Sequence, residues 1–111
     1  MHHPLAAPLQ AAGLRQTFSR LEVLSQFCLA GDQASTGAEV YAGLTRRGVP
    51  MAYSTVYRML QTLSYAGLLL PAGTRGRHPC YRPSSAVLNA WQARPSPVSG
   101  LGLSGPTSPS A

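Results

Sequence analysis

Residues 54–63 read Ser-Thr-Val-Tyr-Arg-Met-Leu-Gln-Thr-Leu, and this stretch decides the fold. Its apolar residues recur at i, i+3, i+4 and i+7, which is the spacing of one face of an α-helix; they are Val56, Met59, Leu60 and Leu63. The opposite face carries Ser54, Tyr57, Arg58 and Gln61. The pattern predicts an amphipathic helix over Tyr53–Ala66 that ends at Gly67.

Two longer helices are predicted before this stretch. In Thr17–Leu29 an apolar stripe is formed by Leu21, Leu24, Phe27 and Cys28. Either Thr17 or Ser19 can cap this helix, and Ser19 has Glu22 three residues later, as a capping box requires. The other helix, Thr36–Arg46, has a second capping-box pattern and a predicted buried side of Val40, Tyr41 and Leu44.

A short helix is predicted before these three helices, and a β-hairpin is predicted after them. Leu5–Ala12 predicts a short helix weakened by Pro8, after a Met1–Pro4 segment expected to fray. Leu68–Leu70 predicts a short strand, and His78–Arg82 a returning strand that Pro79 confines to an edge. The Gly73–Arg77 turn between them carries Arg75 and Arg77. Three helices followed by a basic hairpin predict a mainly α winged helix-turn-helix.

The domain boundary is predicted at residue 83. Residues 1–83 form the winged helix, and residues 84–111 form a Pro/Ser/Gly-rich tail expected to be disordered. One or two loose helical turns are expected around Ala86–Gln92.

Charge and composition restrict the functional class. Nine arginines and no lysine face three acidic residues, a net charge of +6 that favours a polyanionic partner. The acidic residues Glu22, Asp32 and Glu39 each have a capping or turn role, so no catalytic set is recognisable and an enzyme is not expected. With no signal peptide or membrane-length apolar run, the expected location is the cytoplasm, with no membrane contact.

The predicted 53–66 helix has the residues that a DNA-reading helix needs. Tyr57 can contact a thymine methyl or a phosphate, and Arg58 can pair with phosphate or guanine. At the helix start, Ser54 and Thr55 can donate to phosphate or base edges. An ordinary surface helix with solvated Tyr and Arg side chains is the alternative, and so is a surface that binds another protein.

Several segments in order resemble the N-terminal half of the ferric uptake regulator family, over about Leu5 to Pro83. They are Gly13-Leu14-Arg15-Gln16-Thr17, Arg20-Leu21, Val23-Leu24, Ala38-Glu39-Val40-Tyr41, Ser54-Thr55-Val56-Tyr57-Arg58-Met59-Leu60, Leu63 and Ala66-Gly67-Leu68. Thr-Val-Tyr-Arg followed by Ala-Gly-Leu is the most specific part.

The resemblance implies a DNA-binding transcriptional regulator, expected to be a repressor, whose partner is double-stranded DNA. It implies that Tyr57 and Arg58 touch DNA and that Arg15 reaches the minor groove or nearby backbone. Arg75 and Arg77 match wing positions that contact the backbone, and Arg20 matches a basic position that faces phosphate or serves the structure.

Departures from the family pattern concern metal binding and dimerisation. Ala34 stands where the family has a ligand histidine, and Arg82 where a glutamate often follows the wing aromatic. Ser84-Ser85-Ala86-Val87 replaces a His-rich segment, and no CxxC pair follows. No regulatory metal and no cofactor are therefore predicted, and His78 and Cys80 are expected to be ordinary wing residues rather than a weak metal site. The tail after Pro83 is therefore expected to be the remnant of a truncated or frame-shifted regulator. Such a chain is expected to pair with another subunit of the same family.

Overall fold

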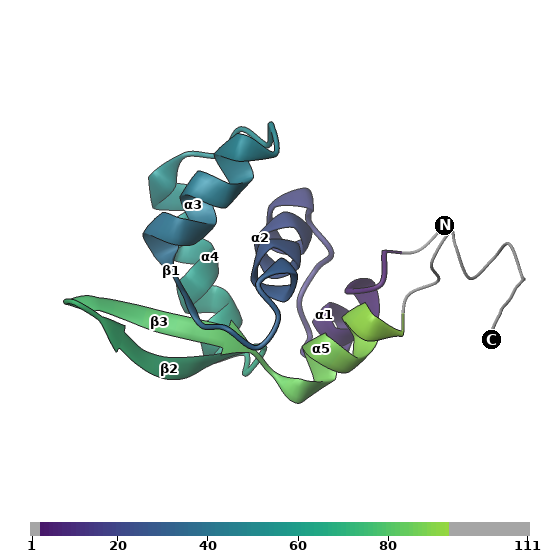
Figure 1. Cartoon of the computed structure of the whole chain (residues 1–111). Helices are drawn as coiled ribbons and strands as arrows, with labels where there is room; N and C mark the ends of the chain where they lie inside the picture. The colour runs from purple at the N-terminus through teal and green to yellow at the C-terminus, as the bar shows by residue number, and fades with distance from the viewer. Residues whose placement is uncertain (1–2, 94–111) are drawn as a thin grey trace, which may run out of the picture.

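The computed structural model describes residues 3–93, which form helices around a small antiparallel sheet (Figure 1). In chain order the elements are α1 Ala6–Ala11, α2 Phe18–Leu29, β1 Ser35–Thr36, α3 Gly37–Arg46, α4 Tyr53–Tyr65, β2 Leu69–Arg75, β3 His78–Pro83 and α5 Ser85–Gln92. The winged helix-turn-helix order is confirmed, with α3 and α4 as the two helices and β2–β3 as the wing. No helix within residues 3–93 has both the length and the apolar character needed to cross a bilayer.

The apolar faces of the three central helices form the core, although the predicted Leu21 and Met59 are only partly buried at its edge. Eight of their side chains are at most 2% exposed: Val23, Leu24, Phe27, Val40, Leu44, Val56, Leu60 and Leu63. Burial of each such side chain contributes on the order of 1.5–3 kcal/mol, which holds α4 against α2 and α3. Tyr41 was predicted on the buried side of α3, and this is wrong: its side chain is 37% exposed and lies edge-on to Tyr53.

Side chains cap the starts of α2 and α3. Arg20 N donates to Thr17 Oγ1 over 3.2 Å, so Thr17 is the N-cap of α2 and Ser19 lies inside the helix. The predicted capping box of α3 is confirmed, because Glu39 N donates to Thr36 Oγ1 and Thr36 N donates to Glu39 Oε1. Both caps satisfy backbone donors that a helix start leaves without a partner.

Pro8 does not disrupt α1. It is the third residue of this helix, where a backbone N–H would have no partner within the helix, so its missing donor costs nothing. Leu5 and Leu9 are fully buried, and they attach the short helix to the core.

The sheet has the order β1-β3-β2, so β3 is its middle strand. The prediction that Pro79 confines this strand to an edge is wrong for the strand as a whole. It holds locally, because β1 pairs with β3 only at Cys80 and Tyr81, and Pro79 is paired only on the β2 side, with Thr74. β1 was not predicted, since two residues show no periodicity.

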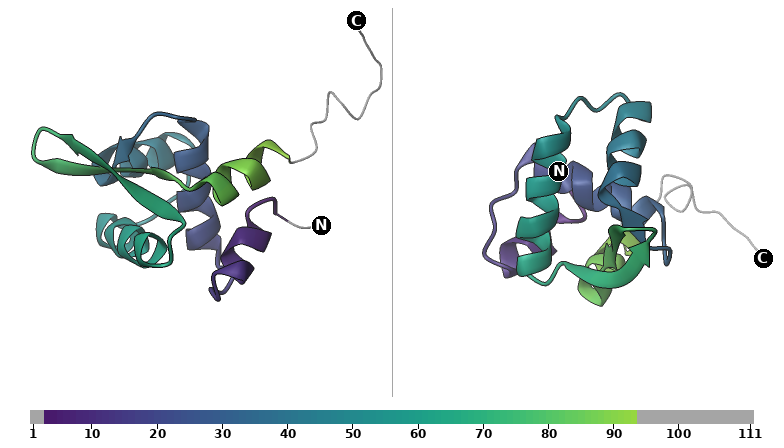
Figure 2. Two further views of the ribbon diagram at one scale, coloured as in Figure 1. Left: turned by 90° about the horizontal axis from the view of Figure 1, so that it is seen from below. Right: turned by 90° about the vertical axis from the view of Figure 1, so that its left-hand side faces the viewer.

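The ordered chain continues past the predicted boundary at residue 83. Ser84 caps α5, whose Val87 side chain is fully buried, and α5 lies beside α1 (Figure 2). Apolar residues in 85–92 therefore add to the core instead of forming loose turns. The rest of the predicted tail, residues 94–111, lies outside the described residues.

Candidate nucleic-acid interface

The outer face of α4 presents the side chains predicted to read DNA. Ser54 and Arg58 are exposed and Tyr57 is 50% exposed, whereas Thr55 is half-buried at the edge of this face. The same helix buries Val56, Leu60 and Leu63. The helix is thus held rigidly by one side while its polar side stays free, as groove recognition requires.

The start of α4 adds an aromatic pair to this face. Ala52 is the N-cap and supplies no side-chain cap, so the first turn is not closed by a neighbouring hydroxyl or carboxylate. The rings of Tyr41 and Tyr53 meet edge to face with centroids 5.5 Å apart. Tyr53 is 47% exposed, and its hydroxyl lies near Gly37 at the start of α3.

Arg15 lies in the connection between α1 and α2, with an exposed side chain. Its backbone carbonyl accepts a hydrogen bond from Arg20 Nη1 over 3.0 Å. The neighbouring Leu14 lines a groove shared with the C-terminal half of α4, including Gln61 and Tyr65. The fold therefore brings the Arg15 segment beside α4.

The tip of the wing is a two-residue turn of Gly76 and Arg77. Gly76 has a φ of 64°, a conformation that residues with a side chain rarely adopt, and hairpin turns of this length require it. Arg77 is exposed on this projecting tip. Figure 2, in its right-hand view, shows the wing pointing to the viewer beside α3 and α4.

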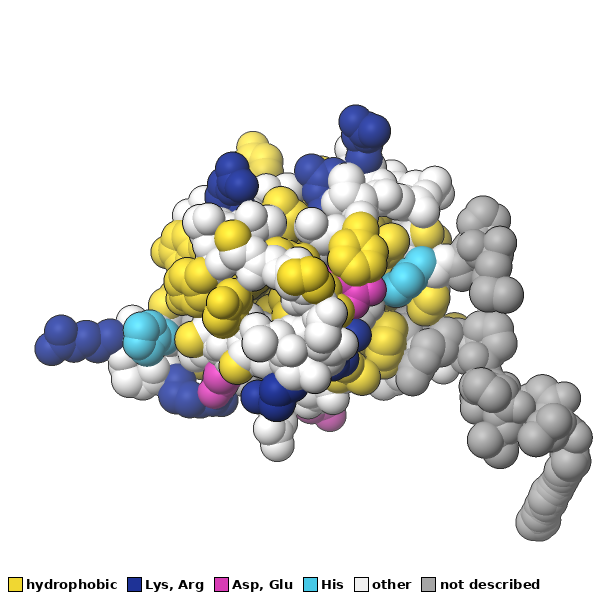
Figure 3. Space-filling view, turned by 90° about the horizontal axis from the view of Figure 1, so that it is seen from above, with side chains coloured by type: hydrophobic (Ala, Val, Ile, Leu, Met, Phe, Trp, Pro, Cys, Tyr) yellow, Lys and Arg dark blue, Asp and Glu magenta, His cyan; other side chains and the backbone are white. Residues whose placement is uncertain are grey.

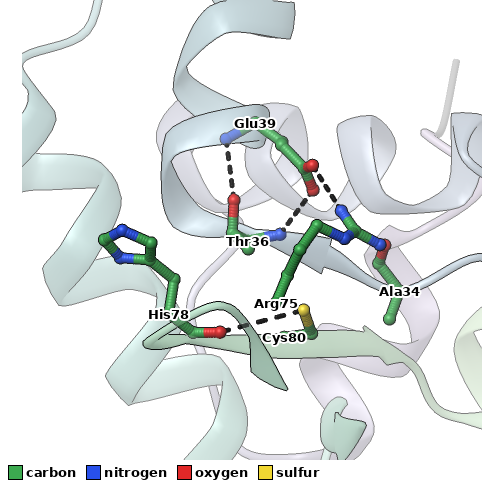
Figure 4. Close-up of polar contacts among 6 residues, drawn as sticks. All are labelled: Ala34, Thr36, Glu39, Arg75, His78 and Cys80. Carbon is green, nitrogen blue, oxygen red and sulfur yellow. Dashed lines mark hydrogen bonds and ion pairs between the residues drawn. The ribbon is translucent and has the colours of Figure 1, made fainter. Parts of the chain in front are cut away.

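Arg75, the other predicted wing contact, is engaged with the protein itself. Its Nη1 pairs with Glu39 Oε2, and its Nη2 donates to the Ala34 carbonyl over 3.2 Å (Figure 4). The backbone N–H of Thr36 lowers the pKa of Glu39, and the Arg75 guanidinium lowers it further despite an opposing effect of burial. The same pair raises the pKa of Arg75.

The positions that match metal ligands in the family do not fit a metal here. Ala34 has no ligating side chain, and its carbonyl accepts from Arg75. Arg82 is a cation that lies in a groove with Asp32 and Ser85. Cys80 is buried with its sulfur directed to the carbonyl of His78, whose imidazole points away (Figure 4). Within residues 3–93 no three His, Cys, Asp or Glu side chains group as metal ligands.

Surface charge around the interface is mainly positive. Seen from above, arginines surround a hydrophobic area, and the projecting wing ends in a cationic side chain (Figure 3). Part of the apolar surface is a groove at the α3–α4 turn, lined by residues including Tyr41, Val49 and Met51. Such a surface attracts a polyanion and offers apolar contacts beside the charges.

Sequence reasoning missed three contributors to this region. The partnership of Glu39 with Arg75 had no sequence signal, because 36 residues separate the two. The Tyr41–Tyr53 pair was hidden because Tyr41 was predicted to be buried. Gln61 was expected on the outer face but was not named as a DNA contact, although it follows Tyr57 by one helical turn and is exposed on the same face.

Comparison with known proteins identifies a family for this sequence. The sequence pattern of the ferric uptake regulator family matches residues 11–87. The ferric uptake regulation protein of Pseudomonas aeruginosa is 31% identical over 70 residues, covering 63% of this chain and 52% of that protein. The chain thus spans about half the length of this curated relative.

Solved structures give the same result for the fold. The ferric uptake regulator of Vibrio cholerae superimposes with a TM-score of 0.66 and 28% identity, covering 72% of this chain and 61% of that one. The manganese-containing regulator of Pseudomonas aeruginosa superimposes with a TM-score of 0.65 and 29% identity, covering 71% of this chain and 60% of that one. With the family pattern matching most of the described residues, this chain belongs to the ferric uptake regulator family.

Proposed function

We propose that this protein is a DNA-binding transcription regulator that inserts α4 into the major groove of duplex DNA. The observation that carries the proposal is the division of α4 into a buried apolar face and an outer face with Ser54, Tyr57 and Arg58. The family membership supports it, because the Vibrio cholerae relative is described as having DNA-binding domains. The net charge of +6 suits the phosphate backbone.

In this proposal the contacts divide into two kinds. Tyr57 and Arg58, with Ser54 and Thr55 at the helix start, meet base edges and adjacent phosphates. Arg15 approaches from the α1–α2 connection and Arg77 from the wing tip, and both neutralise phosphate or enter the minor groove. The regulator acts in the bacterial cytoplasm as a repressor, since protein bound over a promoter excludes the transcription machinery.

A single winged helix covers one half-site, so we expect weak binding by one chain and tighter binding when two subunits occupy adjacent half-sites. The second subunit can be another copy or a longer relative. The structural neighbours include metal-containing regulators, but the described residues of this chain hold no matching ligand set, so no step of the proposal depends on a metal.

The test is selection of bound sequences from random duplex DNA, followed by fluorescence anisotropy with the selected and a scrambled duplex. Arg58→Ala is expected to lose at least tenfold in affinity for the selected duplex, on the order of one lost base or phosphate contact. Arg82→Ala removes the same charge beside α5, away from α4, and serves as the matched control. Equal affinities of the wild type for both duplexes, or equal effects of the two variants, would show that α4 does not read DNA. Co-purification with another protein by a chain that ignores DNA supports the protein-interaction alternative.

A further inference from the structure

We infer that Arg75 is a positioning residue that anchors the distal wing, residues 74–79, to the start of α3, and that Arg77 is the arginine of this segment that contacts DNA. The inference rests on the proposed function for the DNA role of Arg77. The anchor itself rests on contacts within the chain.

The contacts form a closed polar network. Glu39 uses Oε1 to accept from Thr36 N over 2.9 Å and Oε2 to pair with Arg75 Nη1. The other terminal nitrogen of Arg75 donates to the Ala34 carbonyl over 3.2 Å. One carboxylate therefore closes the capping box of α3 and holds the wing at the same time, as Figure 4 shows.

The position of Arg75 in the hairpin makes this anchor effective. Arg75 is the last residue of β2 and pairs with His78 across the tip turn. β1 pairs with β3 only at Cys80 and Tyr81, and the β2–β3 register shifts between Pro71 and Thr74. A two-stranded ribbon alone is marginally stable, so the distal wing benefits from a contact at its outer end. Holding the tip in place lowers the ordering cost when Arg77 meets DNA.

The same contacts argue against Arg75 as a phosphate ligand. Each terminal nitrogen already donates to an acceptor within the protein, so a phosphate that takes over either hydrogen bond displaces Glu39 or the Ala34 carbonyl. Release of Glu39 places an unpaired carboxylate at this surface, and it repels the phosphate backbone. Arg77 is exposed on the turn itself.

The test separates the anchor from the cap. Glu39→Gln removes the charge, but glutamine at this position still completes a capping box. Affinity for the selected duplex is measured against salt concentration for Glu39→Gln, Arg75→Gln, their double variant and the matched control Arg77→Gln. We expect the first two to weaken binding by roughly two- to fivefold, the range of an exposed ion pair. The double variant should be no weaker than either, and the slope of log affinity against log salt should stay unchanged. Arg77→Gln should lower the slope by about one phosphate contact.

The opposite pattern overturns the inference. If Arg75 binds phosphate under restraint by Glu39, then Glu39→Gln tightens binding and Arg75→Gln lowers the salt slope. Hydrogen exchange without DNA tests the anchor separately: the backbone amides of the distal wing, residues 74–78, should exchange faster in Glu39→Gln and Arg75→Gln, but not in Arg77→Gln. Unchanged exchange in all three refutes the anchor, whereas a wild-type chain that binds no duplex refutes the proposed function and the DNA role of Arg77 but leaves the exchange result standing.

Discussion

Arg20 holds the backbone of Arg15 in place, because its Nη1 atom donates to the Arg15 carbonyl oxygen over 3.0 Å. Arg20 lies in the first turn of α2, and its Nε atom is buried without a hydrogen-bond partner among the described residues. The aliphatic part of the side chain is thus packed, while the guanidinium end orients the connection that carries Arg15. Arg15 itself remains exposed.

Arg20→Gln is therefore expected to weaken binding to the selected duplex by about three- to tenfold through loss of this orientation, with the salt slope unchanged. Arg15→Gln is expected to lower the slope by about one phosphate contact. Fluorescence anisotropy at four salt concentrations measures both. A slope that falls equally in the two variants would mean that Arg20 touches phosphate directly, the other role that the family resemblance allowed.

Tyr57 should act through its ring. Tyr57→Ala is expected to lose roughly tenfold or more in affinity for the selected duplex, whereas Tyr57→Phe should retain most of it, because the ring makes the apolar contact with a thymine methyl. The check uses duplexes in which uracil replaces single thymines. When uracil replaces the thymine that Tyr57 contacts, wild-type protein should bind about as weakly as Tyr57→Ala binds the unmodified duplex. If Tyr57→Phe is as weak as Tyr57→Ala, the hydroxyl binds phosphate and the thymine assignment is wrong.

A side chain at Gly43 of α3 would meet the amide end of Gln26 on α2. A Cβ on Gly43 would lie 2.2 Å from Gln26 Nε2, and Gln26 Oε1 is held by Arg47 Nε over 2.9 Å. Gly43→Ala should therefore destabilise the protein by about 1 kcal/mol in urea unfolding, because the overlap outweighs the gain in helix propensity.

The effect of Gly43→Ala on stability should change sign when Gln26 is shortened. In a Gln26→Ala background, Gly43→Ala is expected to stabilise by about 0.5–1 kcal/mol, since only the helix-propensity gain remains. Destabilisation of similar size in both backgrounds would locate the conflict elsewhere than Gln26.

His3 predicts a pH dependence of folding. Its Nδ1 accepts from Leu5 N over 3.0 Å, and burial lowers its pKa, opposed by the charge of Glu22. Because Ser25 Oγ donates to Leu21 O, the 3.4 Å contact between His3 Nε2 and Ser25 Oγ needs the hydrogen on Nε2. Contrary to the expectation of a frayed Met1–Pro4, His3 is thus tied to α2.

The lowered pKa of His3 sets the direction in which folding stability changes with pH. The unfolded chain binds the proton more readily, so the stability from neutral His3 is present above the unfolded value of about 6.5 and decreases as pH falls from there toward the folded pKa. Urea unfolding between about pH 5 and 8 measures this. His3→Asn keeps an acceptor for Leu5 N and should remove this part of the pH dependence, whereas the control His78→Asn should leave it. Equal profiles for wild type and His3→Asn would exclude His3 as the titrating group.

Residue spacing by itself determined the central helices and the outer face of α4. Val56, Leu60 and Leu63 recur on one side, so the opposite side with Tyr57 and Arg58 must face outward. Thr36 and Glu39 determined the start of α3, because a capping box is local. These features depend on residues within a few positions of each other.

Only the tertiary structure decided what depends on distant partners. The fold paired Arg75 with Glu39, a contact that the sequence did not indicate, and β3 looked like an edge strand until Ser35 and Thr36 paired with it. The helix after Ser84 was underestimated because its stability comes from burying Val87 rather than from helix propensity. Each of these features is stabilised by a contact between segments that are distant in the sequence and meet only in the folded protein.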